Sequence, residues 1–376
     1  MFILEEIYFP KSFFWGVKST LSLFDEKNVN ISTEEKIINL QKDLLRELSL
    51  IDKIALNSFF FSIDSELLFS DVSTCSKIYN NFIKELYKRE IEPFINLINP
   101  EWFLSFNIDI FEDEDTRKIL LDNLEKFLSS LDSRVQYYSI WKEPYNLIYN
   151  SNKSNSDEII DLDKIIDIYN KIVQVIKRVN SFAKVSICKE IDINRNNSID
   201  FNFINEIVKS SKQKDSSSFV IKDNKLDFVE FDFGDHSKNG DEYNTLISNL
   251  KKTELEKENK TNENSPEKII EKFSELYDLP IIISDSIEES LDESLKSRQL
   301  IERLYKISKL LKNNSKILGF SYNSLIDHPL ANHQVAKGIY EKNFKNDYVT
   351  LRSIGKVYSN IVKRNCIYEN YLKYIE

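Results

Sequence analysis

The chain contains 376 residues, of which 41% are hydrophobic and 12% aromatic, so it has enough apolar material for a large core. Asp and Glu outnumber Lys and Arg by 61 to 51, and the net charge of −10 argues against a surface for nucleic acids or anionic membranes. With only 6 glycines and 3 histidines, the sequence excludes glycine-rich phosphate loops and disfavours a histidine-rich metal site.

Three cysteines, Cys75, Cys188 and Cys366, are widely spaced and odd in number, which suits a reducing compartment better than a disulfide framework or a zinc site. The first residues do not combine a basic segment with an apolar one, so we expect no signal peptide. No apolar run approaches the roughly 18 residues of a membrane-spanning helix. The sequence therefore predicts a cytoplasmic protein without a metal or another cofactor, and with neither nucleic acid nor a membrane as partner.

Short apolar or β-branched segments alternate with longer segments of helical periodicity. The predicted strands are residues 13–18, 56–64, 92–98, 135–142, 184–189, 226–233, 279–285 and 317–323. The predicted helices are residues 32–54, 76–89, 115–131, 162–179, 201–212, 266–277, 293–311 and 351–363. Eight strands that alternate with eight helices predict the α/β class, as a single (β/α)₈ TIM barrel in which residues 1–376 form one domain.

Residues 250–264 depart from this alternation because they are rich in Lys, Glu, Asn and Thr and poor in apolar side chains. Such a segment forms either a solvated helix or a loop without fixed structure. The composition favours a flexible insertion.

A barrel of this kind carries its functional residues where its strands end. The predicted strand ends form a polar ring of Asp64, Asn99, Lys142, Glu143, Lys189, Asp232, Asp285 and Asn323. Strand ends are near solvent and often polar for that reason alone. Glu230 alternates with Phe231 and would face the barrel interior, where it would need a cationic partner such as Lys142 or Lys189.

Six segments in order along the chain carry recognisable motifs. They are FPKSFFWG at 9–16, YNNFIKELYKREIEPFINL at 79–97, RVQYYSIWKEP at 134–144, LPIIISDS at 279–286, GFSYNSLID at 319–327, and residues 338–344. Together they resemble glycoside hydrolase family 1, the family of β-glucosidases and 6-phospho-β-glucosidases. The resemblance covers almost the whole chain and implies the same barrel fold.

The resemblance places Glu143 at the family's acid/base position. Asp285 stands at the nucleophile position, where the family has a glutamate, and Phe60 replaces the arginine that holds the nucleophile. The cation that would organise the nucleophile is thus missing from the position on the second predicted strand where the family has it. We predict Glu143 and Asp285 as the catalytic pair.

The sugar-binding positions differ from the family more than the catalytic ones do. Asn99 stands in place of a histidine, Lys142 in place of the asparagine that contacts the 2-hydroxyl, and Leu23 near the expected glutamine. Asp232 and Asn323 replace an asparagine and a tryptophan on the sixth and eighth strands. The predicted ligand-binding residues are Asn99, Lys142, Asp232, Asn323 and Asp64.

These substitutions change the chemistry that the site can perform. Retaining glycosidases hold two carboxyl groups about 5–5.5 Å apart, and aspartate in place of glutamate withdraws one of them by about 1.5 Å. The lysine beside Glu143 favours the ionised carboxylate and would make it a poor proton donor, unless Lys142 pairs with Asp64, Asp232 or Asp285.

Three functions are compatible with these residues. The first is a divergent family member whose repolarised barrel mouth binds a carbohydrate or another polar small molecule, or performs altered chemistry. The second is a slow glycoside hydrolase with Glu143 as acid/base and Asp285 as nucleophile or base. The third is a non-catalytic scaffold or protein-binding pseudoenzyme, because fold does not imply function.

Overall fold

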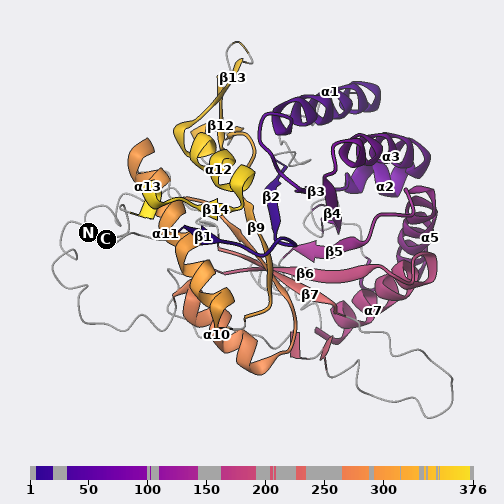
Figure 1. Cartoon of the computed structure of the whole chain (residues 1–376). Helices are drawn as coiled ribbons and strands as arrows, with labels where there is room; N and C mark the ends of the chain where they lie inside the picture. The colour runs from indigo at the N-terminus through magenta and orange to yellow at the C-terminus, as the bar shows by residue number, and fades with distance from the viewer. Residues whose placement is uncertain are drawn as a thin grey trace, which may run out of the picture.

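The architecture comes from a computed structural model. It describes residues 6–19, 32–99, 102, 110–142, 162–191, 204–205, 207–208, 226–233, 265–287, 292–313, 315–329, 334–335, 338–343, 346 and 348–372. Within this part of the chain, eight parallel strands close into a barrel in the order β2 to β9, and β9 pairs with β2. Helices surround the barrel (Figure 1). The predicted (β/α)₈ barrel is confirmed.

The barrel strands lie close to their predicted positions. They are β2 (Phe14–Lys18), β3 (Ser58–Ser62), β4 (Glu92–Ile98), β5 (Tyr137–Lys142), β6 (Lys184–Glu190), β7 (Phe228–Asp232), β8 (Ile281–Asp285) and β9 (Ile317–Tyr322). The main helices are α1 (Thr33–Ile51), α3 (Val72–Lys88), α5 (Glu114–Ser130), α7 (Leu162–Val179), α10 (Pro266–Leu276), α11 (Glu293–Lys312) and α12 (Ser353–Arg364).

Helix α2 (Ser65–Ser70) is an element that the sequence analysis missed, and α3 begins earlier than predicted. Both begin at an aspartate whose carboxylate accepts a backbone hydrogen bond, Asp64 for α2 and Asp71 for α3. An N-cap of this kind stabilises a helix by about 1 kcal/mol. Of the predicted helix 201–212, the described residues 204–205 and 207–208 are helical. Residues 250–264 lie outside the described residues, so the flexible insertion stays a prediction.

Small antiparallel pairs complete the fold outside the barrel. Strand β1 (Ile7–Tyr8) pairs with β14 (Cys366–Ile367), and β12 (Tyr340–Asn343) pairs with β13 (Tyr348–Leu351). The first pairing ties the start of the described chain to the segment after α12. Two further short elements are the hairpin of β10 (His328–Pro329) with β11 (Gln334–Val335), and helix α13 (Glu369–Leu372).

The N-terminal half of the barrel interior is filled by a cluster of aromatic and aliphatic side chains, which we call the floor. Its buried members and the side chains packed on them are Phe14, Phe60, Phe94, Tyr137, Phe228, Ile282 and Leu318. The ring of Phe94 lies 4.4 Å from that of Phe60 and 4.4 Å from that of Tyr137, centroid to centroid. Gly16 is required beside this cluster because a Cβ there would lie 2.5 Å from the Phe60 ring.

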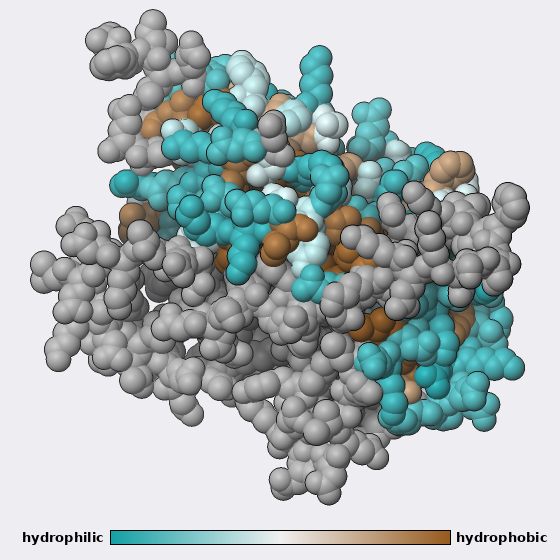
Figure 2. Space-filling view, turned by 90° about the horizontal axis from the view of Figure 1, so that it is seen from below, coloured by the Kyte–Doolittle hydropathy of each residue, from teal (hydrophilic) through white to brown (hydrophobic). Residues whose placement is uncertain are grey.

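The outer surface is largely polar where it is described. Figure 2 shows hydrophilic side chains over most of the coloured part of one face, with hydrophobic side chains in small groups. No helix in the described part of the chain is long and apolar enough to cross a membrane.

Candidate site at the C-terminal end of the barrel

Above the floor, the barrel interior becomes polar. Lys18 on β2 forms ion pairs with Glu230 and Asp232 on β7, although β2 and β7 are not neighbours in the barrel. Because the two strands are separated by β8 and β9, these contacts cross the interior. We call Lys18, Glu230 and Asp232 the ion triad.

The ammonium group of Lys18 has one acceptor for each of its three protons. Its Nζ lies 2.6 Å from Glu230 Oε1, 2.9 Å from Asp232 Oδ2 and 3.9 Å from Cys188 Sγ. The side chains are 15% exposed for Lys18, 7% for Glu230 and 0% for Asp232, so the triad is almost completely shielded from solvent. Burial alone would lower the pKa of Lys18, but the charges of Asp232 and Glu230 outweigh it and raise this pKa well above its ordinary value.

Glu230 is held by a second contact within the barrel. Ser284 on β8 donates its hydroxyl to Glu230 Oε1 at 2.7 Å, and β7 and β8 are adjacent. The prediction that Glu230 faces the interior and needs a cation agrees with this geometry. The cation that the described residues place there is Lys18, and the side chain of Lys142 lies outside the described part of the chain.

Three other interior-facing polar atoms near this layer are buried without a hydrogen-bond partner among the described residues. They are Asn96 Oδ1, Ser139 Oγ and Ser321 Oγ, on β4, β5 and β9. Buried polar atoms in native proteins are normally satisfied by protein, water or ligand. The upper interior therefore holds polar atoms whose hydrogen-bonding capacity the described residues leave unused.

Asp285, at the end of β8, has a different environment from the ion triad. In β8, Ile282 joins the floor and Ser284 bonds to Glu230, so both face the barrel interior. Because side chains alternate along a strand, Ile283 and Asp285 face the helix layer. The Asp285 carboxylate accordingly forms an ion pair with Arg303 on α11. Phe60 stands where the family has an arginine, and here Arg303 in the helix layer supplies a cation to this carboxylate.

The other oxygen of Asp285 remains uncommitted. Asp285 Oδ1 is buried and has no hydrogen-bond partner within the described part of the chain. The Asp285 backbone carbonyl accepts the amide of Asn323, the residue after β9, at 2.8 Å. Asp285 and Asn323 are therefore brought together, as the sequence predicted for neighbouring strand ends.

Two further predicted ligand-binding residues have structural contacts. The Asp64 carboxylate accepts the amide of Leu67 at 2.9 Å as the N-cap of α2, and burial raises the pKa of this carboxyl. Asn99 follows β4, and its backbone amide donates to Ser65 Oγ at 3.1 Å. These contacts bind the loops after β3 and β4 to each other at the C-terminal end of the barrel.

The segment after β9 is held by a second ion-pair network. Asp327 accepts the amide of Gly338 at 2.9 Å and pairs with Arg352 at 2.7 Å, while Arg352 also reaches Glu293 at 3.1 Å. The network connects this segment to the first turns of α11 and α12. Asn323 therefore lies on a segment with a fixed anchor.

Part of the predicted site lies outside the described residues. Glu143 and Leu23 belong to that part, and of Lys142 only the backbone at the end of β5 is described. The Glu143–Asp285 separation and the pairing of Lys142 stay predictions. Among the described residues, no group of three or more His, Cys, Asp or Glu side chains is arranged to hold a metal ion.

Sequence reasoning missed Lys18 and Arg303. A signal for Lys18 existed, since it shares the alternation of Phe14 and Gly16 on β2 and so faces inward. No comparable signal marked Arg303, which is one of several basic residues along α11.

Comparison with known proteins supports the fold. No protein-family model matches the sequence, and no curated protein matches it. Among solved structures, the family 1 β-glucosidase from Thermotoga maritima is similar with a TM-score of 0.67 and 14% identity, over 97% of this chain and 100% of that one. The β-glycosidase from Pyrococcus horikoshii is similar with a TM-score of 0.68 and 17% identity, over 98% of each chain. The chain thus has the fold of family 1 β-glucosidases.

Proposed function

We propose that this chain is a divergent glycoside hydrolase family 1-like protein whose barrel mouth binds a carbohydrate or another polar small molecule. We also propose that the protein does not act as a conventional retaining β-glycosidase. The observation that carries it is the pairing of the described carboxylates with cations: Glu230 and Asp232 with Lys18, and Asp285 with Arg303.

A polar ligand suits the upper barrel interior. Uncommitted oxygens of Asn96, Ser139 and Ser321 would accept hydrogen bonds from hydroxyl groups of a guest. The Thermotoga maritima β-glucosidase has been solved in complex with deoxynojirimycin, and it aligns with 96% of this chain at a TM-score of 0.66. A sugar-like ligand is therefore the first to test.

Conventional retaining catalysis is disfavoured by the position of Asp285. The nucleophile must approach the sugar from the barrel mouth and stand about 5–5.5 Å from the acid/base carboxyl. The Asp285 side chain is instead directed at Arg303 in the helix layer, and it is one methylene shorter than glutamate. Full hydrolytic activity would require this pair to separate first.

Two alternatives stand against this proposal. Slow hydrolysis with Glu143 as acid/base and Asp285 as nucleophile or base is favoured by the placement of Asp285 at a strand end, next to Asn323. A non-catalytic scaffold or protein-binding role is favoured by the burial of the ion triad. The proposal also includes a cytoplasmic location, supported by three buried free cysteines.

Calorimetric titration with deoxynojirimycin tests ligand binding, and a panel of aryl β-glucosides, β-galactosides and their 6-phospho forms tests hydrolysis. We expect saturable binding but no substantial turnover. Turnover above about 1 s⁻¹, the lower end for ordinary enzymes, that is abolished in Glu143→Gln or Asp285→Asn but kept in Asp122→Asn would establish a working hydrolase. Asp122 is an exposed residue of α5 and serves as the matched control. Neither binding nor turnover would favour the scaffold.

A further inference from the structure

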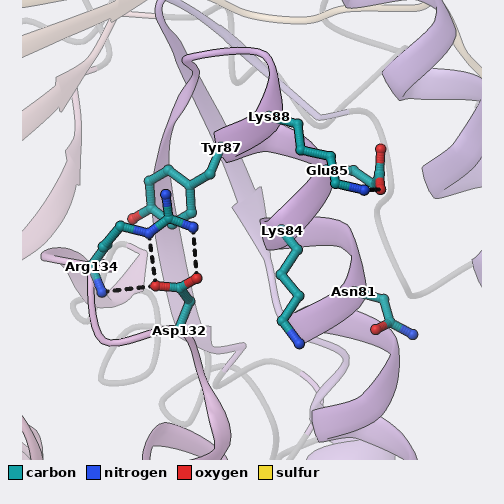
Figure 3. Close-up of a pocket in the computed structure, with 7 residues that line it drawn as sticks. All are labelled: Asn81, Lys84, Glu85, Tyr87, Lys88, Asp132 and Arg134. Carbon is teal, nitrogen blue, oxygen red and sulfur yellow. Dashed lines mark hydrogen bonds and ion pairs between the residues drawn. The ribbon is translucent and has the colours of Figure 1, made fainter.

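A groove of about 520 Å³ lies on the outside of the barrel, far along the strands from the candidate site. One wall is the C-terminal half of α3, with Asn81, Lys84 and Tyr87, and the other is the turn before β5, with Asp132 and Arg134 (Figure 3). Both walls immediately precede barrel strands. Because parallel strands all start at the same end of the barrel, the groove belongs to the N-terminal face, opposite the barrel mouth.

Arg134 is oriented in this groove by an ion pair and an aromatic ring, although its side chain is 60% exposed. Its Nε and Nη2 donate to the two oxygens of Asp132 at 2.9 and 2.7 Å, and its guanidinium lies 4.2 Å from the centre of the Tyr87 ring. The Tyr87 hydroxyl in turn donates to Glu92 Oε1 at 3.3 Å. Among the described residues, Nη1 of Arg134 has no hydrogen-bond partner, while the contacts with Asp132 and Tyr87 orient the guanidinium before any ligand binds.

The charges of the groove are unequal. Glu85 is already paired with Lys88 at 2.5 Å and with Arg89 at 2.9 Å, and Asp132 is paired with Arg134. Lys84 is exposed and makes no hydrogen bond or ion pair within the described part of the chain. The lining side chains thus carry one positive charge in excess, on a protein whose net charge is −10.

We propose that this groove binds a small divalent oxyanion, such as a phosphate group or a dicarboxylate, between Lys84 and Arg134. Lysine supplies a mobile ammonium and arginine a planar fork, which together recognise phosphate and carboxylate oxygens. The amide of Asn81, one turn from Lys84 and exposed, is a neutral donor at the edge of the same site. The volume is within the range of small-molecule sites.

Isothermal titration calorimetry at low ionic strength tests the proposal, with inorganic phosphate and succinate as the two probes. We expect saturable binding of at least one probe, and the stronger of the two identifies the preferred oxyanion. Lys84→Glu should weaken this binding by about tenfold or more, since it removes a charge-assisted contact and adds a repulsive charge. Added salt should weaken it further.

The matched control is Lys118→Glu, the same charge reversal at an exposed position of α5. It should leave the affinity within about twofold of the wild type, because a charge outside the site is screened by solvent. Arg134→Gln should weaken binding as Lys84→Glu does, and circular dichroism checks that both variants fold. The proposal is overturned if neither probe saturates the wild type, or if Lys118→Glu weakens binding as much as Lys84→Glu. Deoxynojirimycin binding should be unchanged in Lys84→Glu, which separates this site from the barrel mouth.

Discussion

In the N-terminal half of the barrel, Phe94 packs between Phe60 and Tyr137, whereas in the C-terminal half Lys18 reaches across the interior to two carboxylates. The floor is stabilised by apolar burial, which requires only that the rings fill the space. The ion triad is stable only while each charge keeps its partner, because an unpaired buried charge costs several kcal/mol.

The two layers therefore respond differently to substitution. Loss of volume in the floor leaves a cavity, and the cost depends on how far the neighbours can close it. Loss of a charge in the triad leaves its partners unpaired, and the cost can be recovered by neutralising those partners. Four substitutions or conditions separate the two responses.

The largest effect is expected for Lys18→Met. It removes the Lys18 cation from the buried carboxylates of Glu230 and Asp232 and should lower the free energy of unfolding by about 3–5 kcal/mol in urea titrations at pH 7. Adding Glu230→Gln and Asp232→Asn should recover most of this loss. Exposed Lys118→Met, the control, should change stability by less than about 0.5 kcal/mol. A Lys18→Met protein as stable as the wild type would contradict the assignment of a closed triad.

Arg303→Met should have the next largest effect. It leaves the Asp285 carboxylate buried beside α11 without its cation, at an expected cost of about 2–3 kcal/mol. In a double-mutant cycle, Asp285→Asn should suppress most of that cost. Additive costs would show that the two side chains are not coupled. The cycle also tests whether Asp285 is engaged with the helix layer or free for chemistry.

A smaller effect is expected from pH at the edge of the floor. Burial raises the pKa of Glu92, at the start of β4, from 4.5 to about 7, against hydrogen bonding from Tyr87 and the charge of Arg134. At this group the folded state then binds more protons than the unfolded state between these values, so the contribution of Glu92 to stability is greatest below pH 4.5 and falls as pH rises to 7. Partial exposure reduces the loss to about 1–2 kcal/mol.

Glu92→Gln tests this assignment, because glutamine cannot titrate. Between pH 4.5 and 7, the wild type should lose stability relative to Glu92→Gln, so the difference in their unfolding free energies should grow and then level off above pH 7. A difference that is flat across this range would show that Glu92 titrates normally. Glu90→Gln, on an exposed neighbouring residue, provides the control.

The smallest effect is expected for Phe94→Leu in the floor. Leucine keeps most of the apolar volume, so the loss should be about 1 kcal/mol. The loss should be the same at low and high salt, since no charge is involved. A salt-dependent loss, or one as large as that of Lys18→Met, would mean that the floor and the ion triad are not independent.

The fold was predictable because its signals are local. Apolar periodicity and caps such as Ser32 before α1 determine where helices begin, and eight strands in alternation with helices allow few other arrangements. The structure confirmed the barrel and placed all eight strands near their predicted positions. Helix α2 was missed because a six-residue helix is too short to show a period.

The side of its strand that Glu230 occupies was also predictable, while the side that Asp285 occupies was not. Strand β7 reads FVEFD, and the charged residues at alternate positions indicate one face. Strand β8 reads IIISD, and a strand that is apolar on both faces has no such alternation to show which side Asp285 takes. Only the contacts with the floor, Glu230 and Arg303 decided it.

The sequence by itself determined the order of strands and helices, the barrel they form and the polarity of the strand ends. The tertiary structure alone decided which charges meet: Lys18 with Glu230 and Asp232 across the barrel, and Arg303 with Asp285 between the barrel and α11. Periodicity records which side of its own element a residue faces. The partner on the other side depends on how the barrel closes, which brings together residues that are 214 positions apart in the chain.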